Sequence, residues 1–286
     1  MDEHLRIPGG RQRSIYYHPK NEFLSTGNSF VNHARSKLLY NELAPFYELA
    51  TTRDTDRECR FIHDVIQRYR PESRSILDLG CGVGRHAGLL NREYEYIVTG
   101  VDISTKCLAQ ARNKYPNCAF FVDDIRHFCP KAQCDVAICM WSTFSYLSLP
   151  EDLRQFFRSV YDALLCDGLL IIDVGNYQIA DAETYSREVE NGSHRLNIKI
   201  KKEVENGINE AIYQYEIINL STHQVLLVTD QELSRVYSAE DVEASGKSFF
   251  ISLDRYGDYD IRNGFDPNKS NRIIVVFRKR RANTCN

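Results

Sequence analysis

The stretch SILDLGCGVGRH at residues 75–86 decides the fold. Its first apolar residues, Ile76 and Leu77, predict a short buried strand that ends near Asp78. Three glycines then stand at alternate positions, and a helix-like apolar run begins directly after them. Glycine lets the backbone approach a ligand where a Cβ would clash, and a helix N-terminus offers unpaired N–H groups. A strand, a glycine turn and a helix in this order predict a nucleotide-binding site.

The spacing of the glycines separates the kinds of nucleotide site. Dinucleotide folds use G-x-G-x-x-G, whereas here Asp78 and the glycines form D-x-G-x-G-x-G, so the third glycine comes one residue early. A phosphate-binding loop ends in Gly-Lys-Ser or Gly-Lys-Thr, and this loop continues into Arg85-His86. The pattern disfavours both sites, although an NAD-dependent oxidoreductase and a plain strand–helix turn remain alternatives at this point.

The composition predicts a soluble globular protein. The 286 residues are 43% hydrophobic and 26% charged with a formal net charge of −3, so we expect neither nucleic acid nor a membrane as the main partner. Nine cysteines occur without a C-x-x-C pair, which disfavours zinc-ribbon and thioredoxin sites and indicates reduced thiols. The first residues lack the apolar core of a signal peptide, and no run of about 18 apolar residues exists. We therefore expect a cytoplasmic protein.

The residues before the first strand predict a helical cap. Residues 1–74 begin with a polar arm that contains Tyr16 and Tyr17. Helical spacing of apolar residues then occurs at 32–50, interrupted by a proline, and again at 56–70. Because these helices precede the glycine turn, we expect them to cover it.

The rest of the chain combines a core and an insertion. Residues 75–180 and 237–281 alternate strands with helices, which predicts βαβ units, a mostly parallel sheet and an antiparallel last strand. Residues 181–236 alternate apolar and polar side chains around Asn206-Gly207, which is a strong hairpin signal. We predict an antiparallel β insertion there. It would serve as a wall of the substrate site or as the face of a homodimer.

Acidic residues follow the expected strands. Asp102 ends the second strand, where a carboxylate can accept hydrogen bonds from both ribose hydroxyls or simply cap the next helix. Asp123 and Asp124 end the third strand, where an acid can accept from an adenine amine while Ile125 offers an apolar wall. Because ligands of open α/β sheets bind outside the carboxyl ends of parallel strands, we expect these acids to meet at one site.

Residues 75–175 resemble a class I S-adenosylmethionine (SAM)-dependent methyltransferase. The likeness is carried by residues 78–84, Asp102, residues 123–125 and the turn at 165–173 into the fifth strand. It implies a Rossmann-like α/β sheet with SAM as the cofactor, and an enzyme that transfers a methyl group.

The resemblance also implies roles for single residues. Asp78 and the glycine loop would face the methionine amine and carboxylate, together with the carbonyl of Met140, while Asp102 would bind the ribose and Asp124 and Ile125 the adenine. The cofactor-binding residues implied in this way are Asp78, Gly80, Cys81, Gly82, Gly84, Asp102, Ile103, Asp123, Asp124, Ile125 and Met140.

Within this class, residues 139–147 and the hairpin insertion resemble small-molecule N-methyltransferases, in particular aminosugar N,N-dimethyltransferases. Those enzymes tend to have a histidine where this chain has Tyr146. A tyrosine with an ordinary pKa near 10 is a poor base at neutral pH. An amine acceptor needs only to arrive neutral, whereas a hydroxyl acceptor benefits from a nearby base.

Candidate catalytic and acceptor residues lie near the loop after the fourth strand. We predict Tyr146 and His86 as catalytic residues, with His63 and His127 as other possible bases that are more typical of a solvated helix face. The predicted substrate-binding residues are Tyr16, Tyr17, Tyr47, Trp141, Phe144 and Tyr146. No acidic cluster beyond the cofactor acids is evident, so we expect no metal.

The function predicted from the sequence is methyl transfer from SAM to a small-molecule acceptor, at an amine nitrogen. O- or C-methylation of a secondary metabolite and a non-catalytic SAM-binding protein remain alternatives, because acceptor specificity lies in the cap and the insertion.

Overall fold

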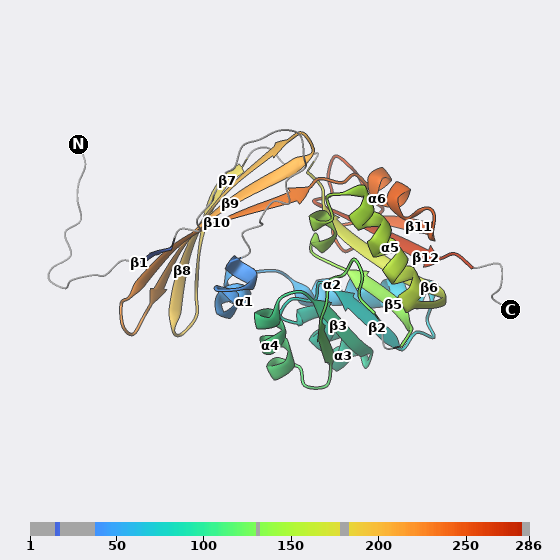
Figure 1. The fold of residues 1–286 in the computed structure, drawn as a ribbon, viewed down its shortest axis with the longest axis horizontal. Coiled ribbons are helices and arrows are strands. Elements are labelled where there is room, and N and C mark those ends of the chain that lie inside the picture. Colours follow the sequence, from blue (N-terminus) through green and yellow to red (C-terminus); the bar gives the residue numbers. More distant parts are fainter. Residues whose placement is uncertain (1–14, 18–37, 130–131, 178–182, 282–286) are drawn as a thin grey trace.

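The computed structural model describes residues 15–17, 38–129, 132–177 and 183–281. Its centre is a seven-stranded sheet in the order β11-β12-β6-β5-β2-β3-β4 (Figure 1). The strands are β2 (Ser75–Leu79), β3 (Ile97–Asp102), β4 (Ala119–Val122), β5 (Cys134–Cys139), β6 (Leu164–Gly175), β11 (Phe250–Gly257) and β12 (Arg272–Lys279). Neighbours from β4 to β6 pair in parallel, whereas β12 runs antiparallel to β6 and to β11. The predicted Rossmann-like α/β sheet is thereby confirmed.

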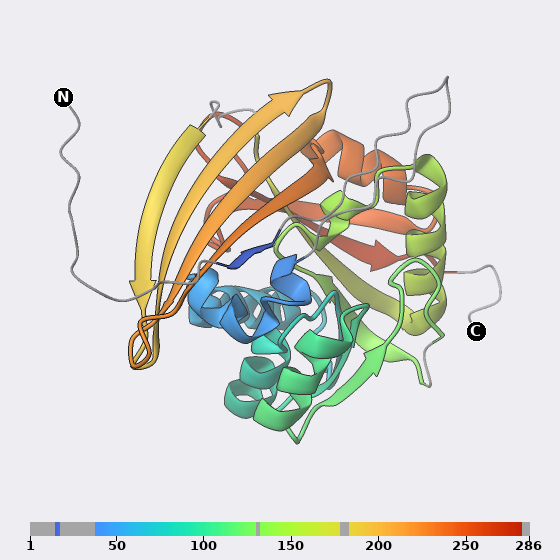
Figure 2. The same cartoon turned by 60° about the vertical axis from the view of Figure 1, so that its left-hand side comes forward.

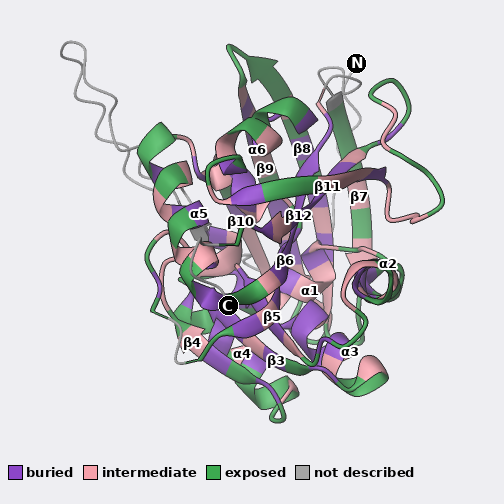
Figure 3. Cartoon of the chain, turned by 90° about the vertical axis from the view of Figure 1, so that its right-hand side faces the viewer, coloured by how far each residue is buried: buried purple, intermediate pink, exposed green. Residues whose placement is uncertain are grey.

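Helices cover both faces of this sheet. They are α2 (Thr55–Tyr69), α3 (Arg85–Tyr94), α4 (Thr105–Lys114), α5 (Pro150–Ala163) and α6 (Ala239–Gly246). Alternate strand residues point to opposite faces, so Ile76 packs with α2, α3 and α4, whereas Leu77 packs with α5 and α6. Figure 3 shows that buried residues follow the strands and the inner sides of the helices, while the outer sides are exposed.

The segment before α2 differs from the predicted long helix at 32–50. Its described part consists of three short turns of helix: η1 (Leu38–Tyr40), η2 (Ala44–Phe46) and α1 (Tyr47–Ala50). Pro45 lies in the first turn of η2, where its missing N–H is tolerated, but it prevents one continuous helix through this stretch. Residues 18–37 lie outside the described part of the chain.

A second sheet stands beside the core (Figure 2). It contains β1 (Ile15–Tyr17), β7 (Glu183–Glu190), β8 (His194–Glu205), β9 (Ile208–Asn219) and β10 (Val225–Arg235), in the order β1-β10-β9-β8-β7. The hairpin at Asn206-Gly207 forms as predicted, with both residues at positive φ. Strand β7 and the parallel pairing of β1 with β10 were not predicted.

The inner face of the second sheet packs on the short helices of the cap. Leu196, Ile198 and Tyr215 form a buried cluster with Leu38 and Leu43. The cap therefore lies between this sheet and the glycine loop. In the described ranges, no helix is both long and apolar enough to span a membrane.

Candidate functional site

The glycine loop joins the end of β2 to the start of α3. Gly82 has φ +54 and Gly84 has φ +77, a backbone region that side-chain-bearing residues rarely adopt. A Cβ on Gly84 would lie 2.9 Å from the Phe120 ring, so this glycine is required for packing. A Cβ on Gly82 would meet only the Tyr47 hydroxyl, at 4.0 Å. The bare backbone of Gly82 is thus the part of the loop that a ligand can approach closely.

Asp102 at the end of β3 organises this loop. Its Oδ2 accepts a 2.8 Å hydrogen bond from the Gly82 N–H, and its Oδ1 accepts one of 2.8 Å from the Ser104 N–H. The Val101 carbonyl accepts from the N–H groups of Gly80 and Cys81, at 2.8 and 3.1 Å. Carboxylate oxygens can accept more than one hydrogen bond each, so the geometry is compatible with a ribose diol as well as with helix capping.

Asp78 is a buried carboxylate at the end of β2. Only 1% of its surface is exposed, and its Oδ2 has no hydrogen-bond partner among the described residues. Burial raises the pKa of Asp78 to about 6, against the lowering effect of the nearby His86 and Arg53. Because buried polar atoms are almost always paired, an unpartnered carboxylate oxygen indicates a place for a hydrogen-bond donor such as an ammonium group.

Arg53 supplies a positive charge to the same site. Its guanidinium lies 4.4 Å from the centre of the Trp141 ring, and its buried Nε has no acceptor within the described part of the chain. The Arg53 charge acts on both Asp78 and Glu58, which places it beside these acids. An arginine and a carboxylate with unused hydrogen-bonding groups suit the carboxylate and ammonium of an α-amino acid.

Trp141 follows β5 and is held by two buried acids. Its indole N–H donates to Glu58 Oε1 at 2.7 Å, and its backbone N–H donates to Asp173 Oδ2 at 2.8 Å. Glu58 Oε2 in turn lies 2.7 Å from His86 Nε2. Burial opposes the charge of Glu58, but the contact with His86 and the charge of Arg53 outweigh it and lower the pKa of Glu58. These contacts fix the Trp141 ring and link it through Glu58 to His86, two residues after Gly84.

Asp173 carries a second set of contacts at the end of β6. Arg272 donates to both of its oxygens at 2.8 Å, and the Tyr259 hydroxyl donates to Oδ2 at 2.7 Å. Burial disfavours the charge of Arg272, but the neighbouring Asp173 raises the pKa of the guanidinium overall. Arg272 also lies 5.6 Å from the Trp141 ring. The indole is therefore in reach of two guanidinium groups at the carboxyl edge of the sheet.

Comparison with known proteins identifies the core. Residues 76–168 match the protein family described as "Methyltransferase domain". This part of the chain is similar to the proteins of that family. The match confirms the resemblance to class I methyltransferases.

Several curated proteins share the methyltransferase domain. The dTDP-3-amino-3,6-dideoxy-alpha-D-glucopyranose N,N-dimethyltransferase of Streptomyces fradiae is 27% identical over 135 residues, which cover 46% of this chain and 52% of the relative. A trans-aconitate 2-methyltransferase of Afipia carboxidovorans is 33% identical over 109 residues, or 36% of this chain and 40% of the relative. The chain spans about half the length of the curated relatives it matches. Aminosugar enzymes among these relatives confirm the closer likeness expected from the sequence.

Solved structures extend the likeness in fold beyond the methyltransferase domain. The sugar N-methyltransferase KedS8 from Streptoalloteichus superposes with a TM-score of 0.72 at 18% identity, over 92% of this chain and all of that one (100%). DesVI of Streptomyces venezuelae gives a TM-score of 0.69 at 19% identity, over 82% of this chain and 95% of that one. At these identities the comparison shows a shared fold.

The predicted adenine residues of the methyltransferase domain lie at the edge of the sheet. Ile125 is half-buried against the core, and Ile103, predicted only as a cofactor-binding residue, is 59% exposed. The Asp124 carboxylate already has a hydrogen-bond partner in Arg126, whose side chain donates to both carboxylate oxygens. The same guanidinium also donates to Asp152. Burial opposes the charge of Asp124, but the hydrogen bonds and charge of Arg126 outweigh it and lower the pKa. Contact with an adenine by these residues stays a prediction.

The other cofactor residues are buried in the loop region. Cys81 and Met140 are buried, and the Met140 carbonyl accepts a 3.2 Å hydrogen bond from the Thr143 N–H. Asp123 is half-buried, and its Oδ1 accepts a 2.9 Å bond from the next backbone N–H. A role for the Met140 carbonyl and for Asp123 in cofactor binding also stays a prediction.

Two predictions for catalysis and acceptor binding need correction. Phe144 has no exposed surface and packs edge-on against Phe156 and Phe157, so it belongs to the core and does not line an acceptor site. His86 is 4% exposed and bound to Glu58, so its geometry supports a positioning role for the Glu58–Trp141 pair and not the base predicted for it. Both lie on elements that the sequence placed near the cofactor, but their side chains turn inward.

The remaining predicted acceptor residues have different environments. Tyr47 is buried beside the glycine loop. The Tyr146 hydroxyl lies 3.2 Å from the Tyr40 hydroxyl, and burial followed by the charge of Glu232 raises the pKa of Tyr146 well above its usual value. Tyr146 is therefore protonated at neutral pH and cannot act as a base there. The backbone of Tyr16 and Tyr17 forms β1, but their side chains lie outside the described part of the chain.

The other two candidate bases, His63 and His127, lie on the surface or in contacts of their own. His63 stacks on Tyr94 at 4.3 Å, with its Nδ1 3.0 Å from the Tyr96 hydroxyl, and His127 is exposed. Within the described ranges, no group of three or more His, Cys, Asp or Glu side chains is placed to hold a metal ion.

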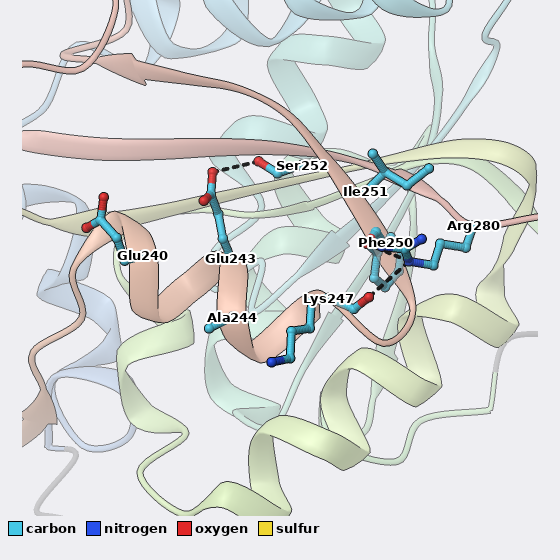
Figure 4. A pocket seen from close by; sticks show the side chains of 8 residues that line it. All are labelled: Glu240, Glu243, Ala244, Lys247, Phe250, Ile251, Ser252 and Arg280. Atoms are coloured by element: carbon cyan, nitrogen blue, oxygen red, sulfur yellow. Dashed lines mark hydrogen bonds between the residues drawn. The ribbon is translucent and has the colours of Figure 1, made fainter.

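Two hollows on the surface are described, one next to this site and one away from it. One of about 380 Å³ borders the glycine loop through Arg53 and Arg85. The other, of about 360 Å³, lies between α6 and the edge strand β11 (Figure 4). It is lined by Glu240, Glu243, Ala244, Lys247, Phe250, Ile251, Ser252 and Arg280. None of these residues belongs to the site at the carboxyl ends of the parallel strands.

Sequence reasoning missed Arg53, Glu58, Asp173 and Arg272. Arg53 lies in the irregular segment between α1 and α2, and Glu58 lies on the buried side of α2. In neither place does the spacing of residues distinguish a functional charge from a solvated one. Asp173 lies two residues before the end of β6 and thus had a signal similar to that of Asp78 and Asp102, an acid near the carboxyl end of a parallel strand.

Proposed function

We propose that this chain is a SAM-dependent methyltransferase that methylates a nitrogen atom of a small-molecule amine. The observation that carries the proposal is the buried Asp78 carboxylate with its unpartnered oxygen, beside Arg53, in a methyltransferase domain. A zwitterionic amino acid offers the ammonium and the carboxylate that these two groups lack. The methionine part of SAM has both.

The residues that would hold the cofactor follow from this geometry. Asp78 would accept hydrogen bonds from the ammonium, and Arg53 would donate to the carboxylate. Asp102, already fixed by two N–H groups, would bind the ribose hydroxyls. The bare face of Gly82 would allow close approach, since a side chain there would project into the ligand.

The chemistry needs little from the protein beyond positioning. When bound, SAM supplies a methyl group on a cationic sulfur: the nitrogen lone pair forms the N–C bond while the C–S bond breaks and its electron pair returns to sulfur, leaving S-adenosylhomocysteine. The methylated nitrogen of a primary or secondary amine gains a positive charge and then releases one proton to solvent. Trp141, fixed by Glu58 and Asp173, provides an aromatic face that favours cations near the reacting atoms.

Nitrogen is favoured over oxygen as the acceptor atom for two reasons. No base was found at Tyr146, whose pKa is raised, or at His86, which is bound to Glu58. A neutral amine has a free lone pair and requires no base, in contrast to a hydroxyl group. Aminosugar N,N-dimethyltransferases are also among the relatives.

The test is calorimetric titration with SAM and S-adenosylhomocysteine. Wild type should bind both, Asp102→Ala should lose most of the affinity, and Asp162→Ala on the exposed surface of α5 should bind like wild type. Release of S-adenosylhomocysteine is then measured with dTDP-3-amino-3,6-dideoxy-D-glucose and other primary amines, and with their hydroxyl counterparts. Failure of wild type to bind either compound would refute the proposal, and turnover of hydroxyl acceptors alone would refute its nitrogen part.

A further inference from the structure

The short helix α1 of the cap ends with backbone carbonyls that need partners from elsewhere in the chain. The last turn of a helix leaves its carbonyls without a partner inside the helix, and α1 has only 4 residues. Arg85, the first residue of α3, binds two carbonyls of this segment. Its guanidinium donates to the carbonyl of Glu48 at 2.9 Å and to that of Thr51 at 2.7 Å. Arg85 therefore ties the end of α1 to the helix that follows the glycine loop.

Arg187 binds the same segment from the second sheet. On β7 it stands directly opposite Ile198 of β8, which is buried in the cluster with the cap, so both side chains lie on the inner face of this sheet. Its guanidinium donates to the carbonyl of Ala50 and, at 3.1 Å, to the hydroxyl of Thr52. Figure 1 shows α1 between the second sheet and the core. The second sheet thus holds the end of α1 through Arg187.

Arg53 follows this held segment directly. The next residue, Asp54, is the N-cap of α2, and its side chain accepts a 3.0 Å hydrogen bond from the Arg57 N–H. The backbone of Arg53 is therefore fixed on both sides, by the bonds to residues 48–52 and by the cap of α2. Its guanidinium lies 4.4 Å from the centre of the Trp141 ring, and its buried Nε has no acceptor among the described residues. The place of this guanidinium thus depends on how its backbone is held.

The charges around the adjoining hollow explain why Arg53 needs such a hold. Burial and the charge of Arg53 both lower the pKa of the Arg85 guanidinium, so the two cations are close enough to repel each other. Glu48 lies 3.6 Å from Arg85 and offsets part of that charge. The hollow of about 380 Å³ is lined by Glu48, Thr51, Thr52, Arg53, Thr55 and Arg85. An Arg53 side chain whose backbone was free would move away from Arg85 into solvent.

We propose that Arg187 of the second sheet is a positioning residue for the cofactor site and acts through Arg53. Together with Arg85 it holds residues 48–52, so that the Arg53 guanidinium stays against Trp141 and meets the methionine carboxylate of SAM. The proposal rests on the proposed function, which assigns that carboxylate to Arg53. It gives the β insertion a part in cofactor binding, in addition to the roles expected from the sequence.

The experiment is a double-mutant cycle of Arg53→Met and Arg187→Met, with the affinity for S-adenosylhomocysteine measured by calorimetry. Arg187→Met should weaken binding about tenfold, as Arg53→Met does, because the same hydrogen bond to a carboxylate is lost. The double variant should bind like Arg53→Met alone, because Arg187 then has nothing left to position. The control is Arg195→Met, on the outer face of the same sheet, where Arg195 lies 2.7 Å from Glu190. It should bind like wild type.

The fluorescence of Trp141 reports on Arg53 without any ligand. Trp141 is the only tryptophan of the chain, so quenching of its fluorescence by acrylamide measures the exposure of this one ring. Arg187→Met should increase the quenching, because Arg53 no longer stays over the ring, whereas Arg195→Met should not. Urea unfolding shows whether each variant folds cooperatively. If Arg187→Met does not, Arg187→Lys takes its place with the same expected direction, since a lysine keeps the charge but cannot bridge both groups.

The outcomes separate this inference from the proposed function. Unchanged affinity or unchanged quenching in Arg187→Met would overturn the role of Arg187. A further loss of affinity in the double variant, as large as in Arg187→Met alone, would also overturn it, because Arg187 would then act independently of Arg53. Failure of wild type to bind S-adenosylhomocysteine would refute the proposed function, whereas the quenching would still test whether Arg187 holds Arg53 in place.

Discussion

Replacing Asp78 by asparagine should stabilise the protein while disabling its proposed site. The pKa of Asp78 is about 6 in the fold, against about 3.9 for an unfolded aspartate. The folded state therefore binds the proton more tightly, so stability from this group is fully present below pH 4 and is lost as pH rises through 6. The difference of about 2 pKa units corresponds to a penalty of about 3 kcal/mol at pH 8. Asparagine keeps the shape and removes the charge that causes the penalty.

The assay is urea unfolding of both proteins without cofactor, at pH 4.5 and pH 8. The same arithmetic gives a gain for Asp78→Asn of about 1 kcal/mol at pH 4.5 and about 3 kcal/mol at pH 8. A gain that is equal at the two pH values, or a loss at pH 8, would refute the reasoning. The midpoint and slope of each transition separate a true stability change from a change in the unfolded state.

Asp135 on β5 provides a control, because its pKa is shifted in the opposite direction to that of Asp78. It accepts hydrogen bonds from the backbone of Arg74 and Ser75 and forms an ion pair with Arg70. Burial opposes its charge, but these bonds outweigh it and lower the pKa of Asp135 to about 2. Its stabilising contribution is therefore present above pH 4 and is lost only as pH falls towards 2. Asp135→Asn should destabilise the protein at both pH values.

Cofactor binding completes the test of Asp78. Asp78→Asn should bind S-adenosylhomocysteine at least tenfold more weakly at pH 8, because the charged hydrogen bond to the ammonium is lost. In wild type the bound ammonium favours the ionised carboxylate, so binding below pH 6 releases a proton. The affinity therefore becomes weaker as the pH is lowered through 6. Calorimetry in two buffers of different ionisation enthalpy measures this proton directly. Full affinity in the more stable variant would show that Asp78 does not contact the cofactor.

Three further substitutions test other parts of the site. Arg53→Met should weaken the affinity for S-adenosylhomocysteine about tenfold or more, because a hydrogen bond to a carboxylate is lost. The free energy of unfolding should change little, and calorimetry measures the affinity. Gly82→Ala should lose binding more strongly than stability, since its Cβ projects into space bounded only by the Tyr47 hydroxyl; a normal affinity would contradict the close approach proposed there. Trp141→Phe leaves Glu58 without its indole donor and should cost about 1–3 kcal/mol of stability in urea unfolding, with a drop in methyl transfer.

Strand periodicity and strand-end acids were enough to predict the fold and part of the site. The carboxyl ends of parallel strands lie at one edge of a sheet, so Asp78 and Asp102 could be placed together from their positions alone. The match of residues 76–168 to a methyltransferase domain agrees with that placement. These features are local in the chain, and no long-range contact is needed to infer them.

What could not be predicted depends on side-chain direction and on long-range packing. Phe144 and His86 lie near the site, yet the side chains of both are buried. Phe144 is in the short η3 (Thr143–Tyr146), which gives no periodicity from which to infer this, and His86 is in the first turn of α3, before the helical pattern is established. Arg53 and Glu58 reach the site from the cap across a large separation in sequence. Strand β7 has mostly polar and exposed residues, so its alternation was too weak to separate it from a loop.

The contrast between the two strand-end acids explains how one site can be both stable and ready to bind. Asp102 already accepts hydrogen bonds from Gly82 and Ser104, so it shapes the loop in the absence of a ligand. Asp78 has an unpartnered oxygen and a raised pKa, so its charge carries a burial cost that a hydrogen-bond donor such as an ammonium would reduce. The first acid fixes the geometry, whereas the second converts binding of an ammonium into relief of a burial cost. An asparagine should therefore be tolerated by the fold at 78 and harmful at 102, where it would turn an amide N–H towards a backbone donor.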